Sequence, residues 1–214
     1  LDVRLSFHPG QFCVLASENP HTVSNSIEEF EYHANMIRWM GFGQRFQDFK
    51  CNVHIGGKLG PKGIIAALKR LSPEARNSIT IENAEFTWQL QHSLELKDHV
   101  ALVLDVHHHW IATGEYIEPN DPRIEQITAS WRGVRPVIHL SCSREEHCLE
   151  FQDPTMLPDL ADLMQLGLTR QKLRAHSDFY WNQAVNSWAK THLTWADIML
   201  ESKEKNLARD KFLT

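Results

Sequence analysis

Short apolar runs alternate along this chain with longer segments in which apolar residues recur every three or four positions. Short runs rich in β-branched residues are typical of strands, whereas the three-to-four spacing is typical of amphipathic helices. The short runs predict strands at residues 3–7, 51–55, 79–81, 100–105, 136–140 and 196–200. Strands that alternate with helices favour βα units and a parallel sheet. The pattern therefore predicts an α/β fold.

The helical segments are less evenly marked than the strands. The clearest helix is predicted at residues 23–40, and Gly41 supplies its end. Further helices are predicted at residues 62–71 and 157–168, and residues 198–207 are expected to continue from the last strand into a charged helix. No low-complexity tract or linker divides the chain, so we expect one domain across residues 1–214.

A histidine or a carboxylate stands at or near the end of every predicted strand. These residues are His8, His54, Glu82, Asp105 with His108 three positions later, His139 and Glu201. In a (β/α) barrel the carboxyl ends of all strands meet on one face, so side chains from distant segments would share one pocket. Mixed imidazoles and carboxylates suit Zn, Mn or Fe, whereas a Ca or Mg site is mostly oxygen. The pattern predicts a divalent metal site at the mouth of a barrel.

Each of these residues also has an ordinary explanation. A single histidine at a strand end is more often hydrogen-bonded in the core than bound to a metal, and a lone carboxylate is usually a helix cap. Six strands that share the feature favour the metal site. Residues His107, His108 and His109 are ambiguous, because alternate side chains of an extended segment face opposite ways. We expect His108 in the pocket, with His107 and His109 as weaker candidates for supporting roles.

Composition narrows the class of protein. The formal charge of −5 over 214 residues argues against a partner held by positive charge along the whole chain. No apolar run approaches the ~18 residues of a membrane span, so we expect no membrane partner. The four cysteines form no Cys-x-x-Cys pair, so reduced thiols are expected. This composition fits a protein of the cytoplasm and nucleoid in a bacterium, or of the nucleus in a eukaryote.

Several short motifs occur in an order that spans nearly the whole chain. They include Phe7-His-Pro-Gly-Gln11, Asn52-Val-His54, Ile81-Glu-Asn83, Asp105-Val-His-His-His109, Ile138-His-Leu-Ser141, Arg174-Ala-His-Ser-Asp178 and Ile198-Met-Leu-Glu201. Through them the chain resembles the UV-damage endonuclease family, relatives of endonuclease IV among the xylose-isomerase-like barrels. The resemblance implies a TIM-type (β/α) barrel that incises damaged double-stranded DNA immediately 5′ to ultraviolet photoproducts. It also implies two or three divalent metal ions, commonly Mn, with Zn or Mg as alternatives.

Carried over residue by residue, the resemblance implies a set of metal ligands. The set is His8, His54, Glu82, Asp105, His108, His139, His176 and Glu201. Within it, Glu82, His108 and Glu201 are taken as catalytic. His176 rests on the resemblance alone, because spacing does not separate it from Asp178.

By the same resemblance, Gln11 and Phe12 would probe the duplex at the lesion. A side-chain wedge can fill the space that displaced bases leave, and an aromatic ring can replace the lost stacking. The alternative is a turn after a strand, with Phe12 in the core. Candidate phosphate contacts are Lys58, Lys62, Arg144 and Arg174. Three divalent ions would change the formal charge from −5 to +1, which would favour a polyanionic partner.

Two features depart from the family's pattern. The family's lysine two positions before the His139 equivalent, which can be carboxylated, is replaced here by Val137. The family's barrel also begins about two βα units earlier, so we expect an incomplete barrel, from a truncated chain or with the missing units supplied elsewhere. Three other functions stay open: an abasic-site endonuclease, a sugar isomerase or epimerase of the xylose-isomerase kind, and an inactive DNA-binding remnant.

Overall fold

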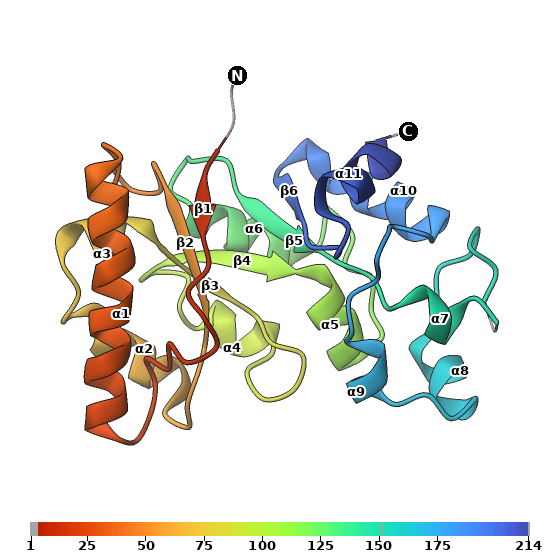
Figure 1. Cartoon of the computed structure of the whole chain (residues 1–214), viewed down its shortest axis with the longest axis horizontal. Helices are drawn as coiled ribbons and strands as arrows, with labels where there is room; N and C mark the ends of the chain where they lie inside the picture. Colours follow the sequence, from red (N-terminus) through yellow and green to blue (C-terminus); the bar gives the residue numbers. More distant parts are fainter. Residues whose placement is uncertain (1–3, 151, 214) are drawn as a thin grey trace.

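The computed structural model of the chain describes residues 4–150 and 152–213. These residues form a six-stranded sheet in the order β1-β2-β3-β4-β5-β6, with every neighbouring pair parallel. The strands are β1 (Ser6–Phe7), β2 (Lys50–His54), β3 (Ile79–Glu82), β4 (Ala101–Asp105), β5 (Val137–Leu140) and β6 (Asp197–Leu200). The sheet curls into a half-barrel (Figure 1). The predicted α/β fold, an incomplete TIM-type barrel, is confirmed.

Helices connect the strands and flank the sheet (Figure 1). They are α1 (Pro20–Trp39), α2 (Gly60–Leu68), α3 (Pro73–Ser78), α4 (Leu90–Leu94), α5 (Val106–Thr113), α6 (Pro122–Ser130), α7 (Glu145–Cys148), α8 (Leu160–Gln165), α9 (Arg170–Leu173), α10 (Gln183–Thr191), η1 (His192–Thr194) and α11 (Lys205–Leu213). None of these helices, within the described residues, combines the length and apolar character needed to cross a bilayer.

The strand predictions hold, but several element boundaries were wrong. β1 is shorter than predicted, and Val3 lies outside the described residues. α1 begins at Pro20 because the side chain of Asn19 accepts a hydrogen bond from the backbone of His21 at 2.9 Å. The helix predicted at residues 157–168 is only α8, and the charged helix α11 starts at Lys205, after a break that follows β6.

The run of three histidines is helical, so the alternation of side chains that an extended segment would give does not apply to it. The carboxylate of Asp105 accepts the backbone N–H of His108 at 2.7 Å and starts α5 as an N-cap. α5 ends at Gly114, whose φ of 79° suits glycine. His108 therefore faces the strand ends through helical geometry, and not through alternation along a strand.

The two faces of the sheet have different roles. Apolar residues of β2 to β5, such as Val53 and Leu104, pack against helix residues including Phe30 of α1 and Ile64 of α2. Side chains alternate along a strand, so the intervening residues face the barrel interior. The lower interior is apolar and contains Ala101, Val103, Trp131 and Val137. The polar side chains gather above it, at the carboxyl ends of the strands.

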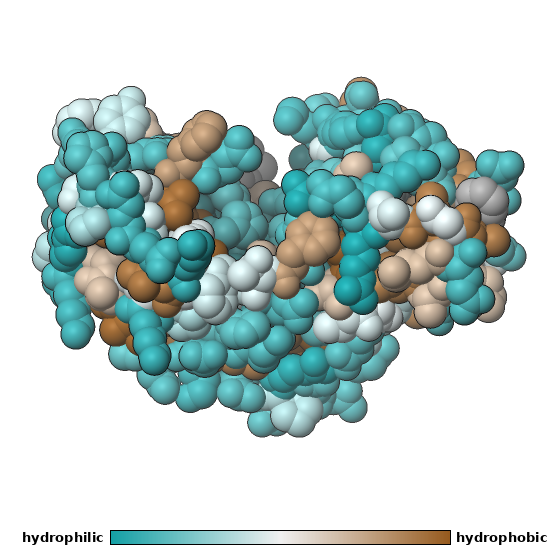
Figure 2. Space-filling view, turned by 90° about the horizontal axis from the view of Figure 1, so that it is seen from below, coloured by the Kyte–Doolittle hydropathy of each residue, from teal (hydrophilic) through white to brown (hydrophobic). Residues whose placement is uncertain are grey.

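The half-barrel is open between β1 and β6. Figure 2 shows a notch between the side of the molecule that carries α1 and the side that carries α10 and α11. At the amino ends of the strands the two sides approach each other through Arg4. Its Nη1 donates to Asp197 Oδ2 at 3.0 Å and to the carbonyl of Arg135 at 2.8 Å. The gap therefore narrows at the end of the barrel opposite the polar residues.

Candidate metal centre

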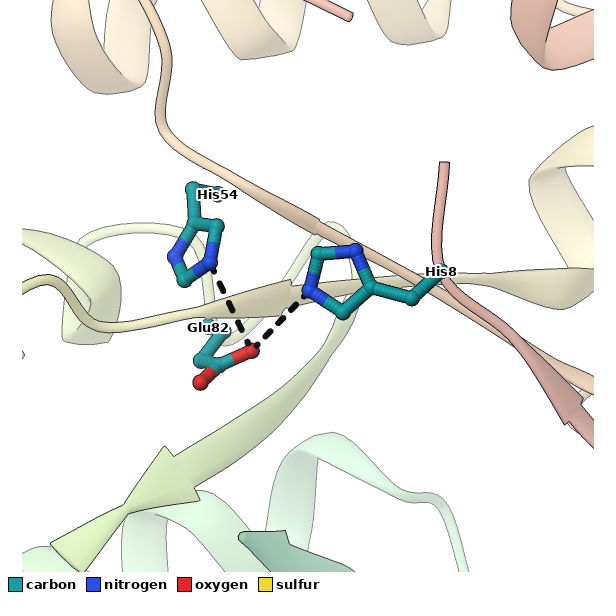
Figure 3. A group of neighbouring side chains, drawn as sticks. All are labelled: His8, His54 and Glu82. Atoms are coloured by element: carbon teal, nitrogen blue, oxygen red, sulfur yellow. Dashed lines mark ion pairs between the residues drawn. The ribbon is translucent and has the colours of Figure 1, made fainter. Parts of the chain in front are cut away.

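Glu82, at the end of β3, is the centre of the cluster. Its Oε2 lies 3.7 Å from His8 Nε2 and 3.9 Å from His54 Nε2, and the three side chains point toward one another (Figure 3). Two atoms that each lie about 2.1 Å from one metal ion are at most about 4.2 Å apart. These three donors therefore fit around a single divalent ion.

A second group of donors shares Glu82 with the first. In the described part of the chain, Glu82, Asp105, His139 and Glu201 each offer a ligand atom within 4.8 Å of the others. His139 Nδ1 lies 3.2 Å from Glu82 Oε2 and 2.9 Å from Glu201 Oε1. Glu82 is 1% exposed, and Asp105 is fully buried. Glu82 can thus bridge two adjacent cations, each with nitrogen and oxygen ligands.

Register and hydrogen bonds fix these side chains. His54 is the register partner of Glu82, and Asp105 is the register partner of His139. The amide of Asn52 donates to Glu82 Oε2, while Asn52 Oδ1 accepts from Thr80 at 2.7 Å. The carboxylate of Glu82 is therefore oriented before any cation binds, which lowers the entropy cost of binding.

Three of the histidines are oriented in the same way. His8, His108 and His176 each direct Nδ1 at a main-chain carbonyl, which leaves Nε2 available as a ligand. The acceptors are the carbonyls of Pro9, Asn83 and Glu201, at 2.9, 3.0 and 2.9 Å. Second partners of this kind fix the tautomer of metal-binding histidines.

The protonation equilibria fit a cation site. Burial raises the pKa of Asp105 to about 8, and its Oδ2 has no hydrogen-bond partner among the described residues. Burial by itself lowers the pKa of His139, but the carboxylates of Glu82 and Glu201 together outweigh this effect and the pKa rises to about 9. Burial raises the pKa of Glu82, yet His139 holds that pKa well below its usual range. In the metal-free protein, protons on Asp105 and His139 thus provide the positive charge that a bound divalent cation would provide.

Lys50 is part of this cluster, and sequence reasoning missed it. It begins β2, is 5% exposed, and its Nζ lies 2.7 Å from His139 Nε2. Burial lowers the pKa of Lys50 to about 8. Val137 belongs to the apolar layer below and carries no polar group into the site. The sequence did contain a signal that could have identified Lys50. It lies four residues before His54 in the same strand, so both side chains are on the same face of the sheet.

The structure leaves His107 and His109 outside the donor groups. His107 lies between the hydroxyl oxygens of Ser141 and Ser143, at 2.8 and 3.2 Å. His109 faces Glu115, with 3.1 Å between Nε2 and Oε2. His107 still contacts the ring of His176, so it borders the site, whereas His109 connects α5 to the segment that follows it.

Gln11 and Phe12, the residues that the resemblance implies for contact with a lesion, lie on an exposed turn after β1. Phe12 is 76% exposed, which is inconsistent with the alternative that places it in the core. Backbone hydrogen bonds join the end of this turn to the loop after β2, from Ala16 N to Gly56 O at 2.9 Å and from Leu59 N to Ala16 O at 2.9 Å. Gly57 has φ +99°, and a Cβ there would overlap the backbone of Ala16. The turn is therefore anchored while its tip projects into solvent.

The four candidate phosphate contacts lie at the surface, and three of them pair with carboxylates. Lys58 lies 3.1 Å from Glu18, and Lys62 is exposed at the start of α2. The other two ion pairs are Arg144 with Glu146 at 2.9 Å and Arg174 with Glu85 at 2.8 Å. Arg174 also lines the cleft that contains His108, His176 and Glu201. Of the four, Arg174 is the residue that shares a cleft with the candidate ligands.

The fold and the site together define a class: α/β half-barrels with clustered histidines and carboxylates at the carboxyl ends of parallel strands. The model of the family described as UV-endonuclease UvdE matches residues 1–212, so the chain belongs to this family. It is 27% identical over 219 residues to the UV DNA damage endonuclease of Bacillus cereus, covering 97% of this chain and 60% of that protein. The identity to the Bacillus mycoides enzyme of the same name is 27% over 221 residues, with the same coverage.

A solved structure gives the same fold. The crystal structure of SacUVDE superposes with a TM-score of 0.73 at 23% sequence identity, over 99% of this chain and 64% of that one. The chain thus spans about three fifths of the length of the relatives it matches.

Proposed function

We propose that this chain carries the metal-dependent endonuclease site of a DNA repair protein that incises the backbone immediately 5′ to ultraviolet photoproducts. The observation that carries the proposal is the pair of donor groups that share Glu82 at the carboxyl ends of parallel strands. Membership of the UvdE family supports the choice of damaged DNA as substrate. The names of the Bacillus relatives support the same choice.

The residues would hold two or three divalent ions, with Mn as the proposed metal. When bound, such ions would supply Lewis-acid chemistry, which activates water and offsets the charge that develops on the leaving oxygen. His8, His54 and Glu82 would hold one ion, and Asp105, His139 and Glu201 would hold a second ion together with Glu82. His108 and His176 remain for a third.

The chain's own groups would orient the substrate. Arg174 and Lys203 line the cleft beside Glu201 and provide positive charge next to the carboxylates. Phe12 and Gln11 project from the anchored turn and would enter the duplex at the damaged step. A cross-linked pyrimidine pair stacks poorly, so extruding it costs less than extruding normal bases. Recognition would therefore depend on deformability more than on base sequence.

The test is incision of a duplex that carries a single cyclobutane pyrimidine dimer, with Mn²⁺ and an end-labelled strand. A product cut immediately 5′ to the dimer supports the proposal. His54→Ala and Glu201→Ala should both abolish cleavage, because each removes a ligand from a different donor group. Cleavage that persists in both variants would show that the proposed centre is wrong.

Parallel substrates separate the other functions. A matched duplex with an abasic site tests for the related endonuclease activity, and aldoses with Mn²⁺ test for isomerisation. Binding of Mn²⁺ and DNA without turnover of any substrate would indicate an inactive remnant. Preference for the dimer over the abasic site, measured as kcat/KM, supports the proposed function.

A further inference from the structure

The loop after β3 presents an aromatic ring at the face where the carboxyl ends of the strands lie. Phe86 follows the end of β3 by four residues and is 42% exposed. Its ring lines an open groove of about 370 Å³, here called the Phe86 groove, whose other walls include Gly57, Lys58, Glu85 and Trp88. A single exposed aromatic ring needs no explanation by itself. This ring, however, lines a groove on the face of the barrel where loops build functional sites.

Hydrogen bonds hold the loop that carries the ring. The backbone N–H of Ala84 donates to the carbonyl of Trp88 at 2.9 Å, and the side chain of Gln89 donates to the carbonyl of Phe86 at 3.3 Å. Trp88 Nε1 donates to the carbonyl of Gly57 at 2.9 Å, which joins this loop to the loop after β2. Because the loop is already ordered, a ligand that contacts the ring pays little conformational entropy.

The loop after β2 also connects Phe86 to the turn that carries Phe12. Gly57 packs against the backbone of Ala16 at the end of that turn, while its carbonyl accepts the hydrogen bond from Trp88. β1, β2 and β3 are neighbours in the sheet, so the ends of β1 and β3 are two strand spacings apart. This separation is roughly 10 Å, or about three base steps along DNA. A duplex that Phe12 enters would therefore also lie beside Phe86.

Arg174 connects the ring to the candidate metal centre. Its guanidinium carbon lies 5.7 Å from the centroid of the Phe86 ring, within the range of a cation–π contact. Its Nη1 donates to Glu85 Oε1 at 2.8 Å. Glu85 lines both the Phe86 groove and the cleft that contains His176 and Glu201, so the two hollows adjoin each other. A DNA strand whose phosphodiester lies in the cleft would place a nearby base at the groove.

We propose that Phe86 is a second aromatic contact for DNA, which stacks on a base displaced at the lesion and holds it in the Phe86 groove. The inference rests on the proposed function, because its ligand is a duplex that carries a lesion. Bases leave the stack when a side-chain wedge enters a duplex, and every base has a π face that an aromatic ring can cover. The ammonium group of Lys58 would contact the phosphate of the displaced nucleotide, since its ion pair with Glu18 is exposed and such pairs are weak.

The first measurement is the affinity of the full chain for a duplex with a single cyclobutane pyrimidine dimer. Fluorescence anisotropy is recorded with Ca²⁺ in place of Mn²⁺ to slow incision. Phe86→Leu should weaken binding at least about fivefold, because stacking on one base is lost, whereas Phe86→Tyr keeps the ring and should retain the affinity. Trp39→Leu is the matched control, because Trp39 is 79% exposed at the end of α1. Circular dichroism and bound-metal analysis verify that the variants keep the fold and the metal centre.

Photocrosslinking separates stacking from a merely structural role of the ring. The base analogue 5-iodouracil, which crosslinks readily to an aromatic ring stacked on it, is placed in turn at positions flanking and opposite the dimer. One position should give a crosslink to Phe86 in the wild type, identified by mass spectrometry. Wild-type affinity in Phe86→Leu, or a set of wild-type crosslinks without Phe86, would overturn the stacking contact and leave the proposed function intact. A wild type that binds no duplex would instead overturn the proposed function, so the two failures are distinguishable.

Discussion

Lys50 Nζ lies 2.7 Å from His139 Nε2 inside the barrel, and both side chains are buried. The ammonium group also interacts with the carboxylates of Glu82 and Glu201. Carboxylates in such a place need a cation, because an unpaired buried charge costs several kcal/mol. Lys50 therefore supplies positive charge below the donor groups, at the opposite end of the cluster from the cleft.

Lys50→Met should destabilise the metal-free protein. Removing one partner of a buried charge pair typically costs about 3–5 kcal/mol in the free energy of unfolding. Urea denaturation in EDTA measures the change. Lys62→Met, at an exposed position, is the control and should change stability by less than about 0.5 kcal/mol. Equal stability of the two variants would contradict a charge-balancing role for Lys50.

The metal-free protein should lose stability as the pH rises from 6.5 to about 8. The pKa of His139 rises from 6.5 to about 9 on folding, and that of Asp105 rises from 3.8 to about 8. The folded state thus binds more protons than the unfolded state in this interval, so stability falls with pH. Above pH 8 the lowered pKa of Lys50 acts in the opposite sense and flattens the decline.

The measurement is the Tm of thermal unfolding in EDTA at pH values from 6 to 9. The same series is then repeated with Mn²⁺ in place of EDTA. Because Mn²⁺ replaces the protons on His139 and Asp105, the increase in Tm that it causes should grow with pH. A Tm that rises between pH 6.5 and 8 in EDTA would contradict the prediction.

Glu82→Gln should cost more bound metal than His8→Ala. Glu82 belongs to both donor groups, while His8 belongs to only one. We expect Glu82→Gln to weaken two Mn²⁺ equivalents and His8→Ala to weaken one, as measured by metal analysis after gel filtration. Glu28→Gln, at an exposed position of α1, is the control. Equal losses in the Glu82 and His8 variants would show that Glu82 does not bridge.

Phe12→Ala should reduce lesion binding without reducing stability. The side chain is 76% exposed, so its truncation removes little buried surface. Stacking of an aromatic ring on a base is worth about 1–3 kcal/mol, so affinity for a dimer-containing duplex should fall about tenfold. Fluorescence anisotropy with damaged and undamaged duplexes gives the comparison. Trp39→Ala is the matched control, because Trp39 is 79% exposed on α1. A similar loss in both variants would indicate nonspecific binding.

The sequence by itself determined the strands and the residues at their ends. Apolar runs are local features, so the strands could be predicted from the sequence. The carboxyl ends of the strands in a (β/α) barrel lie together on one face. The convergence of His54, Glu82, Asp105 and His139 could therefore be predicted as well. The helical conformation of residues 106–113 was missed, because the cap from Asp105 was not weighed against the pattern of three histidines.

Only the tertiary structure decided which groups contact one another. The contact of Lys50 with His139 crosses the barrel interior over 89 positions of sequence, and that of Glu85 with Arg174 spans the same separation. Strand curvature and register set such distances, and neither is encoded in a local run of residues. Local patterns thus placed the ligands at the mouth of the barrel, whereas the packing of distant strands and loops determined their partners and charges.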